Sequence, residues 1–269
     1  MLDTSPFLVR HGSPAGLARR DPHSNQGFEG GKAEGKAALE SLNARLSELQ
    51  TALWAESEQS LLIVLQAMDT GGKDGTIRNV FMGVNPQGVR VWGFGAPTEE
   101  ELAHDYLWRI HDHTPANGGI TIFNRSHYED VLVVRVKDLV PESRWQKRYA
   151  HIVDFERLLS DEGTTVVKLF LHISKEEQRS RLEARLQQAD KRWKFNPGDL
   201  EDRKLWDDFQ EAYEEAITRT STEQAPWYVV PADRKWYRDL AVASILIETL
   251  ERMDPRYPPE PDLDGVVVE

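Results

Sequence analysis

The sequence predicts an α/β fold, a sandwich in which helices cover a central, mostly parallel sheet of five strands. Three observations support this prediction. Short, uninterrupted apolar runs, typical of strands buried on both faces, recur along the chain. Segments with apolar residues three or four apart, typical of amphipathic helices, separate most of these runs. A glycine-rich segment follows the first run directly, which indicates a strand, a turn and a helix in succession.

The predicted strands share a high content of branched and aromatic apolar residues. In chain order they cover residues 61–65, 89–94, 120–123, 166–173 and 227–230. The first of them, LLIVL, contains no polar residue, as expected for a strand in the middle of a parallel sheet.

The predicted helices show apolar residues at helical spacing or a capping sequence at the first turn. They cover residues 33–56, a helix start at 75–82, 98–111, 142–160, a basic segment after Ser174, a segment from about Leu200, and 236–253. Thr98 with Glu101, and Ser174 with Glu177, match the capping box, in which two side chains satisfy backbone N–H groups at a helix start.

The length of 269 residues suits one sizeable domain, which we place at 33–254. Residues 1–32 are rich in Gly, Ser, Pro and charge without a sustained period, so we expect an irregular N-terminal segment. Residues 255–269 are acidic and proline-rich, which predicts a flexible C-terminal tail.

Composition excludes several functional classes. The chain has no cysteine, so disulfides, thiolate metal sites and cysteine nucleophiles are absent. A net charge of −12 argues against a general nucleic-acid-binding protein, which usually carries a basic face. No apolar run approaches the roughly 18 residues of a membrane helix, and the first residues lack a signal-peptide pattern. We therefore expect a soluble cytoplasmic protein that binds neither nucleic acid nor membrane.

The glycine-rich segment at 67–76 (AMDTGGKDGT) resembles a phosphate-binding loop. Such a loop wraps backbone N–H groups around a phosphate, and its lysine reaches the terminal phosphates. The match to G-x-x-x-x-G-K-[ST] is imperfect, because Ala67 replaces the first glycine and Asp74 replaces the metal-binding hydroxyl, with Thr76 too far along to substitute simply. An ordinary glycine-rich turn remains the alternative at this point.

Polar and charged residues at 124–130 (NRSHYED) follow the third predicted strand. Ligands of parallel α/β sheets collect at the carboxyl ends of strands, so we expect this cluster to face the same crevice as Lys73. Arginine suits phosphate oxygens, and carboxylates suit magnesium. The alternative is that Glu129 and Asp130 merely begin the next helix.

A basic stretch runs from Lys168 to Lys194, with eight basic and four acidic residues and a net charge of +4. Arg181 and Arg185 are four residues apart and would share a helix face. Taken alone, such a stretch can be no more than a solvated helix face.

Five collinear segments strongly resemble the polyphosphate kinase 2 family. They are 66–76 (QAMDTGGKDGT), 123–130 (FNRSHYED), 170–178 (FLHISKEEQ), 191–194 (KRWK) and 225–227 (APW). The resemblance implies a three-layer P-loop kinase-like sandwich with a helical lid near 179–200. It also implies magnesium-dependent, reversible phosphoryl transfer between inorganic polyphosphate and a nucleotide. Asn124, where many members carry aspartate, resembles the subgroup that phosphorylates both nucleoside mono- and diphosphates, which would make AMP and ADP, or GMP and GDP, acceptors.

The resemblance also implies roles for individual residues. Asp69, Lys73 and Arg125 would be catalytic, and Asp130 would join them and share the metal with Asp69 in place of the carboxylate missing at Asn124. The phosphate loop would comprise Thr70, Gly71, Gly72, Lys73, Asp74, Gly75 and Thr76. Asn124, Arg125 and Glu129 would bind nucleotide. Because polyphosphate is a long anion, the lid would supply a track of cations: Arg181, Arg185, Lys191, Arg192 and Lys194.

Three rival functions remain at the level of sequence. An ATP-dependent nucleoside monophosphate kinase would share the loop and lid. A nucleotide switch of the GTPase type is disfavoured, because no Asn/Thr-Lys-x-Asp guanine-reading segment is present. A purely structural α/β module would bind no nucleotide. The resemblance further implies a homo-oligomer, with tetramers as the family tendency.

Overall fold

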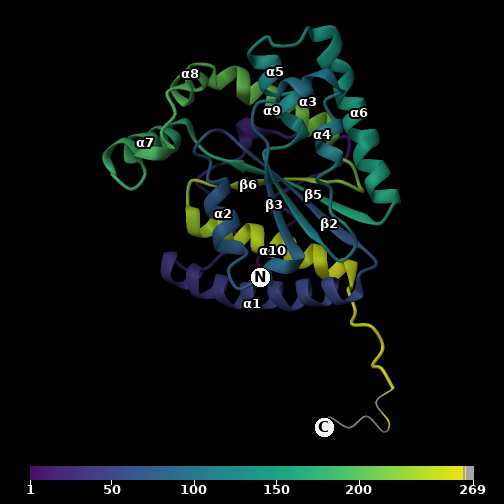
Figure 1. Ribbon diagram of the computed structural model, residues 1–269. Helices are drawn as coiled ribbons and strands as arrows, with labels where there is room; N and C mark the ends of the chain where they lie inside the picture. Colours follow the sequence, from purple (N-terminus) through teal and green to yellow (C-terminus); the bar gives the residue numbers. More distant parts are fainter. Residues whose placement is uncertain (263, 265–269) are drawn as a thin grey trace.

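The computed structural model describes residues 1–262 and 264, and its centre is a twisted six-stranded sheet with the strand order β1-β6-β5-β2-β4-β3 (Figure 1). The strands are β1 (Leu8–Val9), β2 (Ser60–Ala67), β3 (Val89–Gly93), β4 (Ile120–Asn124), β5 (Thr164–His172) and β6 (Trp227–Pro231). β2 pairs in parallel with both β4 and β5, which makes it the central strand predicted from its apolar run.

The five predicted strands form the parallel part of the sheet, and the α/β prediction is confirmed. The sixth strand, β1, pairs antiparallel with β6 and comes from the segment predicted to be irregular. Two residues are too short to show a period in the sequence. The segment is nevertheless buried, since Phe7, just before β1, is 5% exposed and Val9 in β1 is 2% exposed. The N-terminal segment therefore packs against the core.

Ten α-helices lie within the described residues and cover both faces of the sheet. They are α1 (Lys32–Glu56), α2 (Lys73–Val80), α3 (Glu99–Ala103), α4 (Trp108–His111), α5 (Val133–Val136), α6 (Glu142–Asp161), α7 (Lys175–Gln187), α8 (Gly198–Lys204), α9 (Trp206–Thr220) and α10 (Lys235–Met253). Figure 1 shows α10 between α1 and the sheet, α6 and α9 on the opposite face, and α7 and α8 projecting from the body.

Two predicted helices are broken in the structure. Residues 98–111 form α3 and α4 instead of one helix, because the Asp105 carboxylate accepts a hydrogen bond from Leu107 N at 3.0 Å and favours a turn there. The segment from about Leu200 likewise divides into α8 and α9 at Leu205. Apolar spacing predicted both segments, but it does not register such local breaks.

The two predicted capping boxes differ in outcome. At α3 both bonds form, between Thr98 and Glu101. At α7 the Ser174 hydroxyl accepts from Glu177 N at 3.1 Å, but Ser174 N donates instead to Asp233 Oδ1 at 2.8 Å. The Glu177 carboxylate pairs with Arg181, so a tertiary partner replaces the reciprocal bond.

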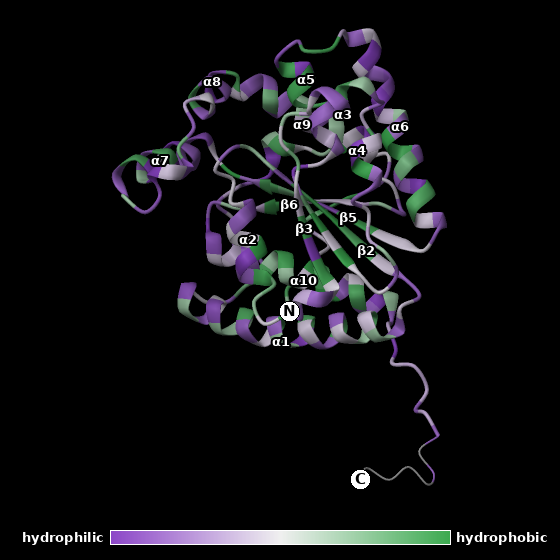
Figure 2. Ribbon diagram, in the orientation of Figure 1, coloured by the Kyte–Doolittle hydropathy of each residue, from purple (hydrophilic) through white to green (hydrophobic). Residues whose placement is uncertain are grey.

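The core is built on β2, all of whose residues are buried. Figure 2 shows apolar strands in the centre and hydrophilic outer helix surfaces. Covering both faces of a parallel sheet buries its strands, which is why β2 tolerates only one polar side chain, Gln66, after Ser60.

No helix within residues 1–262 and 264 has the length and apolarity needed to cross a membrane. After α10 the described part of the tail, 255–262 and 264, leads away from the body (Figure 1). The rest of the predicted tail lies outside the described residues.

Candidate active site

Residues 67–76 comprise the end of β2, a tight loop at 68–72 and the first turn of α2, and two glycines allow the close turn. A side chain at Gly71 would collide with the Cβ of Ala67. A side chain at Gly72, whose φ is +105°, would collide with the Arg238 guanidinium. Ala67 therefore replaces the usual first glycine without crowding, because Gly71 opposite it has no side chain.

The loop gathers hydrogen-bond donors at the start of α2. Thr76 N–H is the first to bond within the helix and donates to Gly72 O at 2.9 Å. The preceding N–H groups of Lys73, Asp74 and Gly75 find no acceptor among the residues that the structure describes. The hydroxyls of Thr70 and Thr76 are also buried without a partner there. Free donors at the positive end of a helix form a cradle for an anion.

Lys73 begins α2 and turns its ammonium group over the loop, where Nζ donates to Ala67 O at 3.1 Å. Burial lowers the pKa of Lys73, and Arg125 lowers it further, whereas Asp69 and Glu129 oppose the shift. The acidic neighbours thus compensate the buried charge only in part. An anion in the cradle would complete the compensation.

Arg125 follows β4 in a left-handed conformation, with φ +65°, which non-glycine residues rarely adopt. Its N–H donates to Leu65 O at 3.2 Å, and its guanidinium donates to Asp69 Oδ1 at 2.8 Å. Burial opposes the charge of Arg125, but Glu129 and Asp69 outweigh burial and raise the pKa of Arg125. Strained residues of this kind concentrate at active sites, because the surrounding structure must hold them in place.

Glu129 shares this crevice with Lys73, Arg125 and Asp69, and all four interact electrostatically. Burial raises the pKa of Glu129 even though both cations lower it. The site therefore holds a second acid, Glu129, whose charge is incompletely compensated.

Asp130, expected to share a metal with Asp69, pairs with two arginines, Arg148 and Arg109. Its carboxylate accepts from Arg148 Nη1 at 2.9 Å and lies 4.0 Å from Arg109 Nη2. Burial raises the pKa of Asp130 against the effect of these two arginines. Adjacent residues of the short helix His127–Asp130 face different sides, and the sequence did not reveal which acid faces Lys73.

Two of the three departures from the usual motifs, Asp74 and Asn124, contact each other. Asn124 Nδ2 donates to Asp74 Oδ1 at 3.0 Å, and Lys194 Nζ donates to Asp74 Oδ2 at 3.0 Å. Although partial burial opposes the shift, these two bonds lower the pKa of Asp74. An aspartate at position 124 would instead place two carboxylates together, so the amide and the acid are complementary. Lys194 also ties the α7–α8 projection to the cradle.

Arg181, expected in the lid and polyphosphate track, contacts the backbone of the phosphate loop. It is 8% exposed and donates to the carbonyl oxygens of Thr70 and Gly71 at 3.0 Å and of Ala232 at 2.6 Å. The four-residue spacing from Arg185 is correct, but spacing alone does not predict that one neighbour faces the loop. Arg181 supports the loop through its backbone.

The other cations expected in the lid lie on or beside the α7–α8 projection. Arg185 Nη1 donates to Asp199 Oδ2 at 3.0 Å, and Arg192 Nε donates to Leu186 O at 3.0 Å. Lys191 and Arg192 are exposed and form no ion pair with the described residues, whereas Lys194 bonds to Asp74.

Sequence reasoning missed three residues that contact or lie near the phosphate loop and Asp69: Gln178, Asp199 and Arg238. Gln178 Nε2 donates to Asp69 O at 3.2 Å, and Arg238 packs against Gly72. Burial and the charge of Asp69 raise the pKa of Asp199, which places this acid near the crevice. Gln178 belongs to the segment 170–178 that resembles the family, so the resemblance could have indicated it as a site residue. Asp199 and Arg238 lie in none of the motifs found in the sequence, so the sequence alone did not indicate them.

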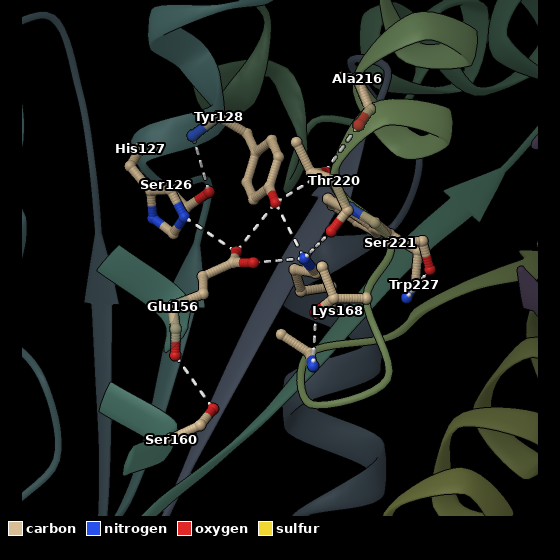
Figure 3. Close-up of polar contacts among 12 residues, drawn as sticks. Ser126, His127, Tyr128, Glu156, Ser160, Lys168, Ala216, Thr220, Ser221 and Trp227 are labelled. Atoms are coloured by element: carbon tan, nitrogen blue, oxygen red, sulfur yellow. Dashed lines mark hydrogen bonds and ion pairs between the residues drawn. The ribbon is translucent and has the colours of Figure 1, made fainter. Parts of the chain in front are cut away.

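A buried polar network lies behind the 124–130 segment (Figure 3). Lys168, counted above in the basic stretch, is fully buried and donates to Glu156 Oε2 at 2.5 Å and Thr220 O at 2.7 Å. Tyr128 OH donates to Glu156 Oε1 at 2.9 Å, and His127 Nε2 lies 3.3 Å from the same oxygen. The network therefore fixes His127 and Tyr128, which follow Arg125 closely in sequence.

A surface cavity of about 850 Å³ opens at the opposite end of the sheet. It is lined by the first residues of β5, by β1 and by Arg252. None of the residues around the phosphate loop lines this cavity, so the size of a cavity alone does not identify the site.

The strand–loop–helix cradle, with Lys73, Arg125 and Asp69 around it, defines a P-loop kinase-like phosphotransferase. The family model described as polyphosphate kinase 2 matches residues 29–258. The chain belongs to the polyphosphate kinase 2 family.

Similar proteins extend over nearly the whole chain. An AMP/ADP-polyphosphate phosphotransferase of Meiothermus ruber is 62% identical, over 94% of this chain and 95% of its own length. An ADP-polyphosphate phosphotransferase of Rhodopseudomonas palustris is 42% identical, over 96% and 93%. The crystal structure of polyphosphate kinase 2 from Arthrobacter aurescens superposes with a TM-score of 0.91 at 47% identity, covering 95% of this chain and 91% of that one.

Proposed function

We propose that this protein transfers a phosphoryl group, reversibly, between inorganic polyphosphate and AMP or ADP. The observation that carries the proposal is the crevice in which Asp69, Lys73 and Arg125 meet above the free N–H groups of the loop. The Meiothermus ruber relative, named for the same reaction, supports the choice of both acceptors. GMP and GDP are acceptors of the same chemistry.

The mechanism we assign depends on position and charge more than on covalent catalysis. The loop N–H groups and Lys73 bind phosphate oxygens. Arg125, held by Asp69, stabilises the negative charge that develops on the transferring group. Asn124 and Glu129 lie beside Asp74 and Arg125 respectively, where the acceptor nucleotide would approach. These groups together exclude water and align donor with acceptor.

Magnesium fits the residues of this crevice. It prefers oxygen ligands and is usually held by one or two carboxylates together with substrate phosphates. We assign Asp69 to it, with the unpaired Thr70 hydroxyl next in sequence. The described residues contain no group of three His, Cys, Asp or Glu side chains suited to a metal, so phosphates would complete the coordination. When bound, magnesium supplies positive charge that neutralises the phosphates.

The lid cations Lys191 and Arg192, with Arg185 and Lys194 beside them, are proposed to guide the polyphosphate chain. Replacing Lys191 and Arg192 together by Ala should raise the KM for polyphosphate several-fold and weaken its dependence on salt, because exposed charges are screened. Arg179→Ala is the matched control, since Arg179 lies on the same helix but pairs with Glu183. Equal salt dependence in both variants would exclude the track.

The proposed function is tested by incubating the protein with magnesium, a nucleotide and a choice of donor. Polyphosphate with AMP should yield ADP and ATP, and polyphosphate with ADP should yield ATP. Phosphorylation of AMP by ATP but not by polyphosphate would establish the alternative, an ATP-dependent nucleoside monophosphate kinase. Lys73→Ala protein, purified in the same way, shows whether a contaminating kinase contributes.

A further inference from the structure

Arg181 uses all five N–H groups of its guanidinium group in hydrogen bonds. An arginine presents five donors in a rigid planar fork. Nε of Arg181 donates to Glu177 Oε1 at 2.7 Å. The two Nη atoms donate, at 2.6–3.1 Å, to four backbone carbonyl oxygens in two separate loops, those of Thr70, Gly71, Ala232 and Asp233. One buried side chain therefore joins the phosphate loop to the turn that follows β6.

The bonds to the phosphate loop fix the direction of its peptide groups. In a planar trans peptide group, the C=O of one residue and the N–H of the next point in opposite directions. The group between Thr70 and Gly71 is bonded at both ends, because Gly71 N also donates to Met68 O at 2.9 Å. The group between Gly71 and Gly72 is bonded at its carbonyl only, and the Gly72 N–H finds no acceptor among the residues that the structure describes. By holding this carbonyl, Arg181 directs the Gly72 N–H to the opposite side of the loop.

The loop needs such a hold because its backbone is strained. Thr70 is a branched residue with φ +62°, in the left-handed region that such residues rarely adopt. Strained conformations persist only where their surroundings fix them. Gln178, from the same helix as Arg181, donates to Asp69 O at 3.2 Å. The first two turns of α7 thus hold three successive carbonyl groups of the loop, those of Asp69, Thr70 and Gly71.

The start of α7 is itself fixed to the turn after β6. The Asp233 carboxylate accepts from Ser174 N at 2.8 Å and from the Ser174 hydroxyl at 2.9 Å, just before the helix begins. The bonds from Arg181 to the carbonyls of Ala232 and Asp233 reach the same turn. The position of the guanidinium group is therefore set by α7 and the turn together, independently of the phosphate loop.

We propose that Arg181 is a positioning residue for phosphoryl transfer, which holds the Gly71 carbonyl so that the Gly72 N–H donates to a phosphate oxygen. The inference rests on the proposed function, because it requires a phosphate in the cradle. Phosphate loops wrap successive N–H groups around the anion. Gly72 directly precedes the three N–H groups at the start of α2 that find no acceptor in the described part of the chain, those of Lys73, Asp74 and Gly75. Arg181 touches no phosphate in this role, since its donors all have acceptors.

Solution NMR of protein labelled with ¹⁵N-glycine tests the Gly72 donor, because 18 glycines give a sparse spectrum. Pyrophosphate should shift the amide resonances of Gly72 and Gly75 in the natural protein. In Arg181→Lys protein, Gly72 should lose most of this shift, because lysine keeps the charge but has three donors on one atom and cannot reach both loops. Gly75 should keep its shift, because α2 orients its N–H. Arg179→Lys is the matched control, since Arg179 lies on the same helix but pairs with Glu183, and it should keep both shifts.

The rate of ATP formation from polyphosphate and ADP measures the catalytic consequence. In Arg181→Lys protein it should fall about 10- to 100-fold, because the misdirected peptide group displaces a donor from the transferring phosphate. Arg179→Lys should keep the natural rate. Thermal denaturation of both variants shows that the compared proteins are folded.

The outcomes separate the role of Arg181 from the cradle itself. Pyrophosphate that shifts Gly75 but not Gly72 in the natural protein would overturn the inference without any variant. Equal loss of both shifts in folded Arg181→Lys protein, or natural shifts together with a natural rate, would also overturn it. If pyrophosphate shifted neither glycine of the natural protein, the phosphate cradle and the proposed function would be contradicted together with the inference.

Discussion

The crevice around Lys73 and the network around Lys168 each hold a lysine with a glutamate nearby, partly buried in the crevice and fully buried in the network, yet they differ in how their charges are satisfied. Lys168 bonds to Glu156, Tyr128 and Thr220. Lys73 has one bond, to a backbone carbonyl. Lys168 and His127 lower the pKa of Glu156 despite its burial, whereas burial raises the pKa of Glu129.

This difference in bonding suits the network around Lys168 to stability and the crevice around Lys73 to function. A buried network whose lysine and glutamate are both hydrogen-bonded holds its neighbours in one arrangement. The crevice has hydroxyls and N–H groups with no partner in the described part of the chain, together with a strained Arg125, and a phosphate ligand would complete these interactions. The network packs behind the segment that carries Arg125, so one region supports the other. We expect substitutions in the network to lower stability, and substitutions in the crevice to lower activity.

The largest expected effect is on stability, from Lys168→Met. Removing one partner leaves Glu156 charged and buried, which should lower the free energy of unfolding by about 3–5 kcal/mol, measured by urea denaturation. The double variant Lys168→Met with Glu156→Leu should regain much of this loss, because it leaves no buried charge. A single variant as stable as the natural protein would show that the network is dispensable.

The next effect is on catalysis, from Lys73→Ala. Its rate of ATP formation should fall at least about 100-fold, roughly 3 kcal/mol of activation free energy, because Lys73 would no longer neutralise the transferring phosphate. Thermal denaturation should show little loss of stability, since Lys73 makes a single hydrogen bond to a carbonyl. A variant that loses stability as well as activity would show that Lys73 also supports the fold, which would contradict the difference between the two regions.

A matched pair of substitutions compares the two glutamates by pH. The pKa of Glu156 is lowered by folding, so its contribution to stability is present above the ordinary value of 4.5 and is lost as the pH falls through the lowered pKa. Glu156→Gln should therefore lower stability at pH 7 and flatten the loss of stability in acid. Urea denaturation from pH 7 to pH 3 measures this, and an unchanged acid profile would contradict it.

The smallest effect has the opposite sign. The pKa of Glu129 is raised by folding, so its charged form is penalised above that raised pKa, and the penalty is relieved as the pH falls through it. Glu129→Gln should stabilise the protein at pH 7 by about 1 kcal/mol, raising Tm by about 2–4 °C, while it lowers turnover. Scanning calorimetry and the ATP assay together test this. Loss of stability would show that Glu129 is already fully compensated.

The sequence predicted the parallel strands and the loop because their signals are local. An apolar run identifies β2, and glycines with Lys73 identify the turn that follows it. It did not predict β1, because its two residues form a strand only by pairing with β6, which is distant in sequence. It also did not predict the partners of Asp130 and Arg181, because the direction of a side chain depends on residues distant in sequence, Arg148 for one and the carbonyls of the loop for the other.

The contact between Asp74 and Asn124 shows what the structure adds to a motif. Each residue departs from the usual pattern, and the two are 50 positions apart in sequence. Read separately, each suggests a missing metal ligand. Side by side, with Lys194 bonded to the same carboxylate, they link the phosphate loop, the sheet and the α7–α8 projection.

The rate of ATP formation from polyphosphate and ADP by Asp69→Asn protein tests the central claim most directly. This substitution keeps the size of the side chain and removes the charge that holds Arg125 and that we assign to magnesium. We expect the rate to fall at least about 100-fold, and the thermal stability to stay close to that of the natural protein. Turnover near the natural rate by the folded variant would contradict it.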